Sequence, residues 1–113
     1  LSLVNKNLIN AAAHITGGGL IENIKRSIPK NLSINIDLGK IKTKKIFKWL
    51  KSQNISDPEM LKTFNCGVGF CVIIDKKNIN QIKKYFTKDY MPYEIGYVSE
   101  SAKKLNLYNS IKW

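Results

Sequence analysis

The sequence has little of what most catalytic and metal-binding sites are made from. Its 113 residues include one histidine (His14), one arginine (Arg26) and two cysteines. Cys66 and Cys71 are five positions apart with no histidine near them, which is not a zinc-ligand spacing. A cysteine nucleophile would have only His14 as its base, so we do not expect covalent catalysis. We expect both cysteines to be buried or half-buried free thiols.

Long apolar runs are also missing. No stretch approaches the ~20 residues that span a bilayer, and the first residues show no signal-peptide pattern. We therefore expect no membrane association and a cytoplasmic location. The sequence begins at Leu1 without an initiator methionine, which indicates a cleaved product or a piece of a longer chain.

Acidic residues are few. Eight Asp and Glu stand against 19 Lys and Arg, and the formal net charge is +11. A basic module that binds RNA or another polyanion is therefore one alternative. However, all but one of the cations are lysines spread along the chain, and nucleic-acid recognition favours arginine. A/T-rich codons also explain the abundance of Lys, Asn and Ile, so we expect a solvated surface and no nucleic acid partner.

The remaining pattern predicts an α/β fold in which a mixed β-sheet is flanked by helices. Alternation over residues 33–38 predicts a half-buried strand with Ser33, Asn35 and Asp37 on its outer side. The apolar run 67–74 predicts a central strand covered on both faces. Further strands are expected over 9–15 and 93–98, and helices over 20–28, 44–52, 56–64 and 78–87. The last strand–helix–strand group resembles a βαβ unit.

Helix and chain ends carry weaker signals. Ser56 and Glu59 have capping-box spacing around Pro58, and Thr43 is expected to cap the helix over 44–52. Residues 1–8 are either the end of an amphipathic helix or an extended lead-in. Residues 99–113 have no clear pattern, although Leu105, Leu107 and Trp113 are expected to dock on the body.

Three consecutive glycines, Gly17, Gly18 and Gly19, are the first candidate site. Glycine is costly to order, so such a run indicates positive φ or close approach of the backbone to a neighbour. At a helix start, free N–H groups would suit an anion such as phosphate. A tight turn without a ligand fits the spacing equally well. His14 is more typical of a packing residue, and Arg26 either pairs with the anion or lies on the surface.

A second candidate lies at the mouth of the apolar run 67–74. Asn65 and two glycines, Gly67 and Gly69, occur there. Glycine within a strand pattern indicates close approach of a ligand or of another backbone. A bulge, or dense packing against a helix, is the alternative.

Together these two segments resemble a known enzyme family. The run His-Ile-Thr-Gly-Gly-Gly-Leu-Ile-Glu-Asn-Ile (14–24) is similar to a signature of the aminoimidazole ribonucleotide (AIR) synthetases, or phosphoribosylformylglycinamidine cyclo-ligases. So is Glu-Met-Leu-Lys-Thr-Phe-Asn-Cys-Gly-Val-Gly (59–69), at the family's separation. Residues 47–50 and 95–98 fall where the family has a similar helix and a similar closing strand, respectively. The sequence departs from the family at Lys25, where proline is usual, and at Lys62, where arginine is usual.

The resemblance implies an enzyme of de novo purine biosynthesis. This family uses ATP and Mg²⁺ to close the imidazole ring of formylglycinamidine ribonucleotide, and it forms homodimers of two-domain subunits. Residues 1–113 would be a single, partial C-terminal domain, without the N-terminal ATP-binding domain, and inactive alone. A related enzyme such as formylglycinamidine ribonucleotide synthetase is the alternative.

The resemblance also assigns roles to the two candidate segments. The glycine turn would hold a phosphate, with hydrogen bonds from His14 (the catalytic candidate) and Thr16. Asn23 and Arg26 would flank it, and Asn65 and Gly67 would line the facing wall. Phosphoryl transfer depends on positioning and charge stabilisation, so no nucleophile is needed. The expected site residues are His14, Thr16, Gly17, Gly18, Gly19, Asn23, Arg26, Asn65 and Gly67.

Overall fold

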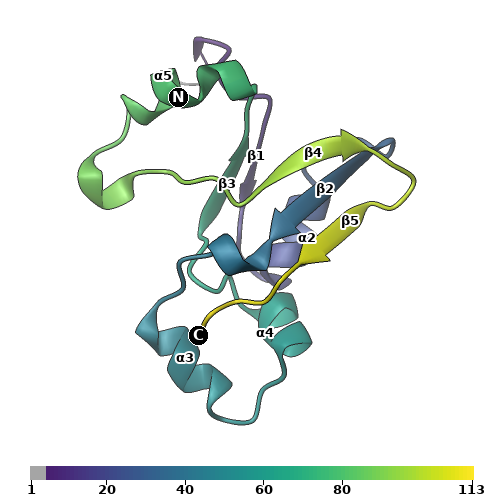
Figure 1. The fold of residues 1–113 in the computed structure, drawn as a ribbon, viewed down its shortest axis with the longest axis vertical. Coiled ribbons are helices and arrows are strands. Elements are labelled where there is room, and N and C mark those ends of the chain that lie inside the picture. The colour runs from purple at the N-terminus through teal and green to yellow at the C-terminus, as the bar shows by residue number, and fades with distance from the viewer. Residues whose placement is uncertain (1–4) are drawn as a thin grey trace.

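The computed structural model describes residues 5–113 and confirms the α/β class (Figure 1). Residues 1–4 of the expected lead-in over 1–8 lie outside the described residues. The helices are α2 (Gly19–Lys25), α3 (Lys45–Lys51), α4 (Asp57–Thr63) and α5 (Ile79–Lys83), and the short 3₁₀ helices are η1 (Leu38–Lys40), η2 (Lys76–Asn78) and η3 (Lys88–Tyr90). The strands are β1 (Ala11–His14), β2 (Leu32–Asp37), β3 (Phe70–Ile73), β4 (Gly96–Glu100) and β5 (Leu105–Tyr108).

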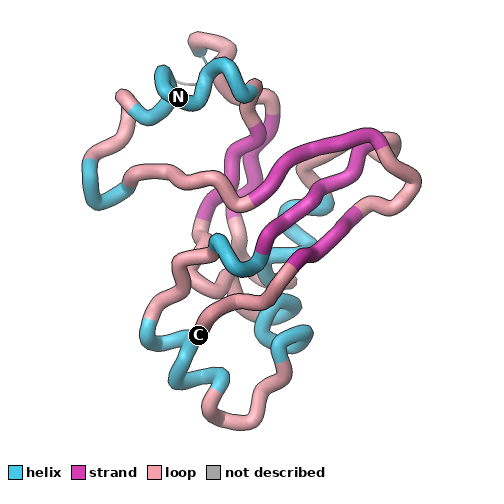
Figure 2. Tube along the Cα trace, in the orientation of Figure 1, coloured by secondary structure: helices cyan, strands magenta, loops and turns pink. Residues whose placement is uncertain are grey.

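The strands form two separate sheets, with α5 at one end of the molecule and α3 and α4 at the other (Figures 1 and 2). β1 pairs antiparallel with β3 and places His14 opposite Phe70. The second sheet is mixed, in the order β4-β2-β5, with β4 antiparallel and β5 parallel to β2. No helix within residues 5–113 is long and apolar enough to cross a membrane.

The sequence pattern assigned the wrong strand to the centre. Residues 67–74 were expected to form a central strand buried on both faces, but β3 pairs only with β1 in the described chain and is partly exposed. Phe70 is 61% exposed. The expected βαβ-like unit is also wrong, because β3 and β4 belong to different sheets. A run of apolar residues indicates that a strand can be buried, but it does not identify the strand or helix that covers that strand.

The strand at the centre of the mixed sheet is β2, and both of its faces are buried. Ile34 and Ile36 face the core as expected. Ser33 and Asn35 were expected on a solvated face, yet they are 0% and 4% exposed. Their polar groups are satisfied by neighbouring strands, because Asn106 of β5 donates hydrogen bonds to both side chains. The prediction that the polar side of β2 is exposed to solvent is therefore wrong.

Helices α2 and α4 pack on each other and against the core, where Leu20 and Met60 are fully buried. The predicted cap of α4 is confirmed, since Ser56 Oγ accepts a hydrogen bond from the Glu59 N–H (3.3 Å). The predicted cap of α3 is wrong: Lys44 occupies the N-cap without a side-chain hydrogen bond, and the buried Thr43 Oγ1 has no partner among the described residues.

The C-terminal tail is more ordered than its sequence suggests. It contains β5, which the sequence pattern missed, and Leu105 packs against the core as expected. Trp113 also packs there, and its Nε1–H donates to Asp57 Oδ1 (3.1 Å). Leu107 docks through its strand, opposite Ile36 of β2, but its side chain is 40% exposed and does not join the core.

Candidate functional site

The two signature segments lie side by side. The Ile15 N–H, which follows β1, donates to the Gly69 carbonyl (2.9 Å). The Leu20 N–H, in the first turn of α2, donates to the Phe64 carbonyl (3.2 Å). Strands β1 and β3 and helices α2 and α4 thus bring residues 14–24 and 59–69 together, although 34 residues lie between them in sequence. These two backbone hydrogen bonds place the two signature segments next to each other.

The glycine turn requires glycine for both of the reasons expected from the sequence. Gly18 and Gly19 have φ of +93° and +72°, in the left-handed region. A Cβ on Gly19 would collide with the Leu61 carbonyl oxygen and stand 2.6 Å from the Lys62 carbonyl oxygen. Gly19 therefore lets the start of α2 approach the backbone of α4. A Cβ on Gly17 would meet nothing within 4 Å.

Asn23 holds this turn closed. Its Nδ2 donates to the carbonyls of Gly19 (2.7 Å), Gly17 (3.2 Å) and Thr16 (3.4 Å). The Gly19 N–H donates to the Thr16 carbonyl (3.1 Å). The N–H groups of Gly19 and Leu20 are therefore both engaged within the protein, although the sequence predicted free N–H groups here for an anion. The exposed part of the turn is Gly17 and Gly18.

The other predicted residues of the first segment are on the surface. His14 and Thr16 are exposed on the approach to the turn, and the His14 ring centroid lies 6.1 Å from that of Phe70. Arg26 is also exposed, but it is the C-cap of α2. It therefore lies at the opposite end of this seven-residue helix from the glycines, a rise of about 10 Å along the axis.

The second segment is a tight turn packed against the loop that leads into α3. Asn65 Oδ1 accepts a hydrogen bond from the Gly67 N–H (2.9 Å), and Cys66 and Gly67 have φ of +54° and +98°. A Cβ on Gly67 would stand 3.1 Å from the Lys42 carbonyl oxygen and 3.2 Å from Thr43 Cα. Dense backbone packing thus explains this glycine without a ligand.

The cysteine thiols are poorly suited to nucleophilic chemistry. Both are free, with Cys66 buried and Cys71 half-buried, as predicted. Burial, and to a smaller degree the charge of Asp57, raises the pKa of Cys66 to about 11. Burial raises the pKa of Cys71 to about 11 as well. Few thiolates form near neutral pH under these conditions.

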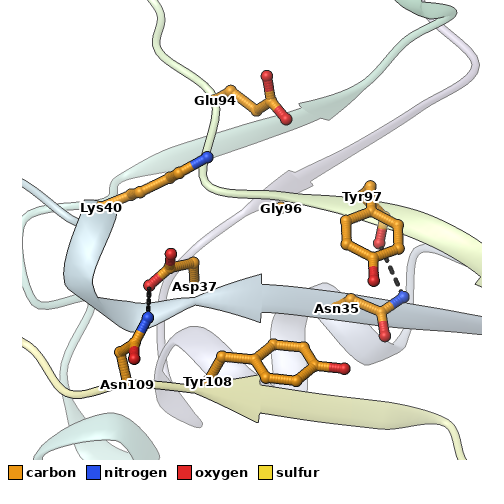
Figure 3. Close-up of a pocket in the computed structure, with 8 residues that line it drawn as sticks. All are labelled: Asn35, Asp37, Lys40, Glu94, Gly96, Tyr97, Tyr108 and Asn109. Carbon is orange, nitrogen blue, oxygen red and sulfur yellow. Dashed lines mark hydrogen bonds between the residues drawn. The ribbon is translucent and has the colours of Figure 1, made fainter.

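A separate hollow of about 400 Å³ lies on the outer face of the mixed sheet (Figure 3). None of the predicted site residues lines it. Its lining is largely polar or aromatic and comprises Asn35, Asp37, Lys40, Glu94, Gly96, Tyr97, Tyr108 and Asn109. The sequence signal for it is the polar side of β2, whose alternation predicts an outer, solvated face. Within residues 5–113, no three His, Cys, Asp or Glu side chains gather as a metal site.

Comparison with known proteins gives one consistent result. A phosphoribosylformylglycinamidine cyclo-ligase of Staphylococcus epidermidis is 46% identical over 90 residues, which cover 78% of this chain and 26% of that protein. The enzyme of the same name from Staphylococcus aureus is 40% identical over 100 residues, covering 87% and 29%. The bifunctional purine biosynthetic protein ADE1 of Schizosaccharomyces pombe is 35% identical over 118 aligned positions, covering 100% and 15%.

The chain thus spans between about one seventh and three tenths of the length of these relatives. A family model described as "AIR synthase related protein, C-terminal domain" matches residues 1–106, which include both signature segments. With nearly the whole sequence matched, the chain belongs to the AIR synthase related protein family, C-terminal domain.

Proposed function

We propose that this chain works as part of a phosphoribosylformylglycinamidine cyclo-ligase in purine biosynthesis. The observation that carries the proposal is the direct contact between the two signature segments. Backbone hydrogen bonds from Ile15 to Gly69 and from Leu20 to Phe64 connect them directly. The family match and the names of the relatives support the same activity.

The proposal extends to the whole protein, because this chain is only a fraction of the length of its relatives. The complete enzyme would use ATP and Mg²⁺ to close the imidazole ring of formylglycinamidine ribonucleotide, as a homodimer in the cytoplasm. As the family resemblance implies, we assign Mg²⁺ and most of the ATP contacts to the rest of the polypeptide. The chain by itself would be inactive.

Within this chain the proposed task is to hold a phosphate group. The exposed Gly17 and Gly18 backbone would face the phosphate, while the His14 imidazole and the Thr16 hydroxyl would donate hydrogen bonds to it. Asn23 would act by fixing the shape of the turn through its three hydrogen bonds to carbonyl oxygens. Such an arrangement contributes to phosphoryl transfer by positioning and charge stabilisation rather than by covalent chemistry.

The test uses the full-length enzyme that contains this sequence. His14→Ala removes an exposed donor, so the fold should persist while kcat/KM for ring closure falls about 10- to 100-fold, the usual range for one hydrogen bond to a charged group. Thr16→Val should give a similar loss. Asn80→Ala, on an exposed position of α5 away from the turn, is the matched control and should leave the rate unchanged.

Circular dichroism and thermal unfolding would establish that each variant is folded. Near-normal turnover in both the His14 and Thr16 variants would contradict the phosphate-holding role. A full-length wild-type protein that lacks ATP-dependent ring closure would contradict the enzyme assignment itself.

A further inference from the structure

The outer face of the β1–β3 sheet carries an aromatic side chain, Phe70, that the proposed function does not use (Figure 1). Phe70 of β3 stands directly opposite His14 of β1 in the antiparallel register, so both side chains lie on the same face of this sheet. Their ring centroids are 6.1 Å apart and the ring planes are tilted by 42°. This is the geometry of a contacting aromatic pair, whose rings usually lie about 4.5–7 Å apart.

The imidazole covers only part of the Phe70 ring. Phe70 is 61% exposed, whereas the other three phenylalanines of the chain are half-buried. A ring held in water forgoes the stabilisation that burial would bring to the fold. Single exposed apolar residues are nevertheless common on protein surfaces, so the surroundings of Phe70 decide its role.

Phe70 lies next to backbone that carries no side chains. The carbonyl of the preceding Gly69 accepts the hydrogen bond from the Ile15 N–H (2.9 Å), two residues before Gly17. Gly17 and Gly69 are both exposed, and a Cβ on either would meet nothing within 4 Å. The other five glycines each have a left-handed φ or an atom within 3.2 Å of an added Cβ, so the fold itself requires them. Close approach of a ligand to the backbone would account for Gly17 and Gly69.

The exposed ring is also near the proposed phosphate position. His14, which contacts Phe70, is three residues before Gly17, a span of at most about 11 Å along the chain. A mononucleotide can bridge this span from its phosphate to its planar end. A protein partner fits less well, because the sheet adds only Ala12 and Val72 to this face, and a specific protein interface buries about 800 Å² on each side.

We propose that Phe70 stacks on the planar, nitrogen-containing end of a nucleotide substrate whose phosphate is held by the glycine turn. The inference rests on the proposed function, because the turn must hold a phosphate for the planar end to reach the ring. Two substrates of the proposed reaction share this chemistry, through the adenine of ATP and the amidine of formylglycinamidine ribonucleotide. Stacking on an aromatic side chain contributes affinity and tolerates different planar groups. Phe70 is then a substrate-binding residue, and it takes no part in the chemical step.

The test measures substrate affinity in the full-length enzyme that contains this sequence. Equilibrium dialysis of ATP alone and of formylglycinamidine ribonucleotide alone gives their dissociation constants without turnover. Phe70→Leu keeps an apolar side chain and removes the aromatic ring, so one of the two dissociation constants should rise about 3- to 10-fold. The substrate whose dissociation constant rises is the one that stacks on Phe70. In steady-state kinetics its KM should rise in parallel, while kcat changes less than about twofold.

Three further variants separate stacking from other effects. Phe70→Tyr restores a ring and should return the dissociation constant to within about twofold of the wild-type value. Gly69→Ala adds a methyl group in open space, so it should weaken binding of the same substrate and leave the thermal unfolding temperature unchanged. Tyr90→Leu removes another exposed aromatic ring, in η3, and is the matched control that should leave both dissociation constants unchanged.

Three results would overturn the stacking role. The first is a Phe70→Leu enzyme with both dissociation constants within twofold of wild type. The second is a fall in kcat at unchanged KM, because Phe70 would then act only by supporting His14. The third is a marked loss of thermal stability in Phe70→Leu, which would mean that another part of the full-length chain covers the ring. A wild-type enzyme that binds nucleotide through Phe70 but does not close the ring would instead contradict the proposed function alone.

Discussion

Replacing Gly19 by alanine tests the packing that joins the two signature segments. Gly19 begins α2 with φ of +72° and is buried against α4. An added Cβ would collide with the Leu61 carbonyl oxygen and stand 2.5 Å from the Lys62 carbonyl carbon. These are backbone atoms of a neighbouring helix, and unlike side-chain atoms they cannot move away by a change of rotamer. One or both helices must therefore move.

The expected loss of stability has two parts. A non-glycine residue in the left-handed region costs about 1–2 kcal/mol. Forcing an extra methyl group into a closely packed contact typically costs a further 1–3 kcal/mol. Gly19→Ala should thus lower the free energy of unfolding by about 2–5 kcal/mol, a large part of the ~5–15 kcal/mol available to a typical domain.

The neighbouring glycines supply matched controls. A Cβ on Gly18 would stand 3.6 Å from Glu22 Cβ, so Gly18→Ala retains only the backbone term of about 1–2 kcal/mol. Gly17 has open space around it and should tolerate alanine within about 0.5 kcal/mol. Urea unfolding followed by circular dichroism gives the three values for the 113-residue chain. A Gly19 variant as stable as the Gly17 variant would refute the packing argument.

Two further predictions concern a pair of buried contacts. Because burial raises the pKa of both thiols to about 11, the rate of their alkylation in the folded chain should still rise with pH well above pH 9. In denaturant the rate should level off near the ordinary thiol pKa of 9.0. A plateau near pH 9 in the folded chain would argue against the burial of these thiols. Trp113→Phe keeps a ring on the core but removes the hydrogen bond to Asp57, so urea unfolding should report a loss of about 1 kcal/mol, and an unchanged stability would mean that the C-terminus does not dock in solution.

Local signals in the sequence predicted local structure well. Ser56 and Glu59 form the expected helix start because a cap depends on atoms within one turn. The glycine run was expected to need positive φ or close approach, and Gly19 shows both. The contact between the segments around residues 14–24 and 59–70 could be expected only from the family resemblance. Neither segment specifies its distant partner through composition or periodicity.

The sequence-based predictions were wrong where they required knowing which part of the chain covers a given face of a strand. The apolar residues of β3 indicated burial on both faces, but in the described chain β1 is its sole strand partner. The alternation in β2 correctly separated Ile34 and Ile36 from Ser33 and Asn35. It could not show that Asn106, more than 70 residues away, would satisfy the polar side. Periodicity thus assigns residues to faces without indicating the surroundings of each face.

The polar side of β2 provides the sharpest test of this distinction. Asn106 Nδ2 donates to Ser33 Oγ (3.2 Å) and to Asn35 Oδ1 (3.0 Å), and both acceptors are buried. Asn106→Ala leaves them unpaired, so it should cost about 1–3 kcal/mol in urea unfolding. The matched control, Asn80→Ala on an exposed helix position, should change stability by less than about 0.5 kcal/mol.

A double-mutant cycle separates the hydrogen-bond network from the loss of side-chain volume. If the network stabilises the sheet, Ser33→Ala should cost about 1 kcal/mol less in the Asn106→Ala background than in the wild-type chain, because the bond between the two is already broken. If this side of β2 were solvated, as its alternation suggested, water would replace the lost partners. The two substitutions would then be additive and each close to neutral, and that outcome would reject the buried polar network.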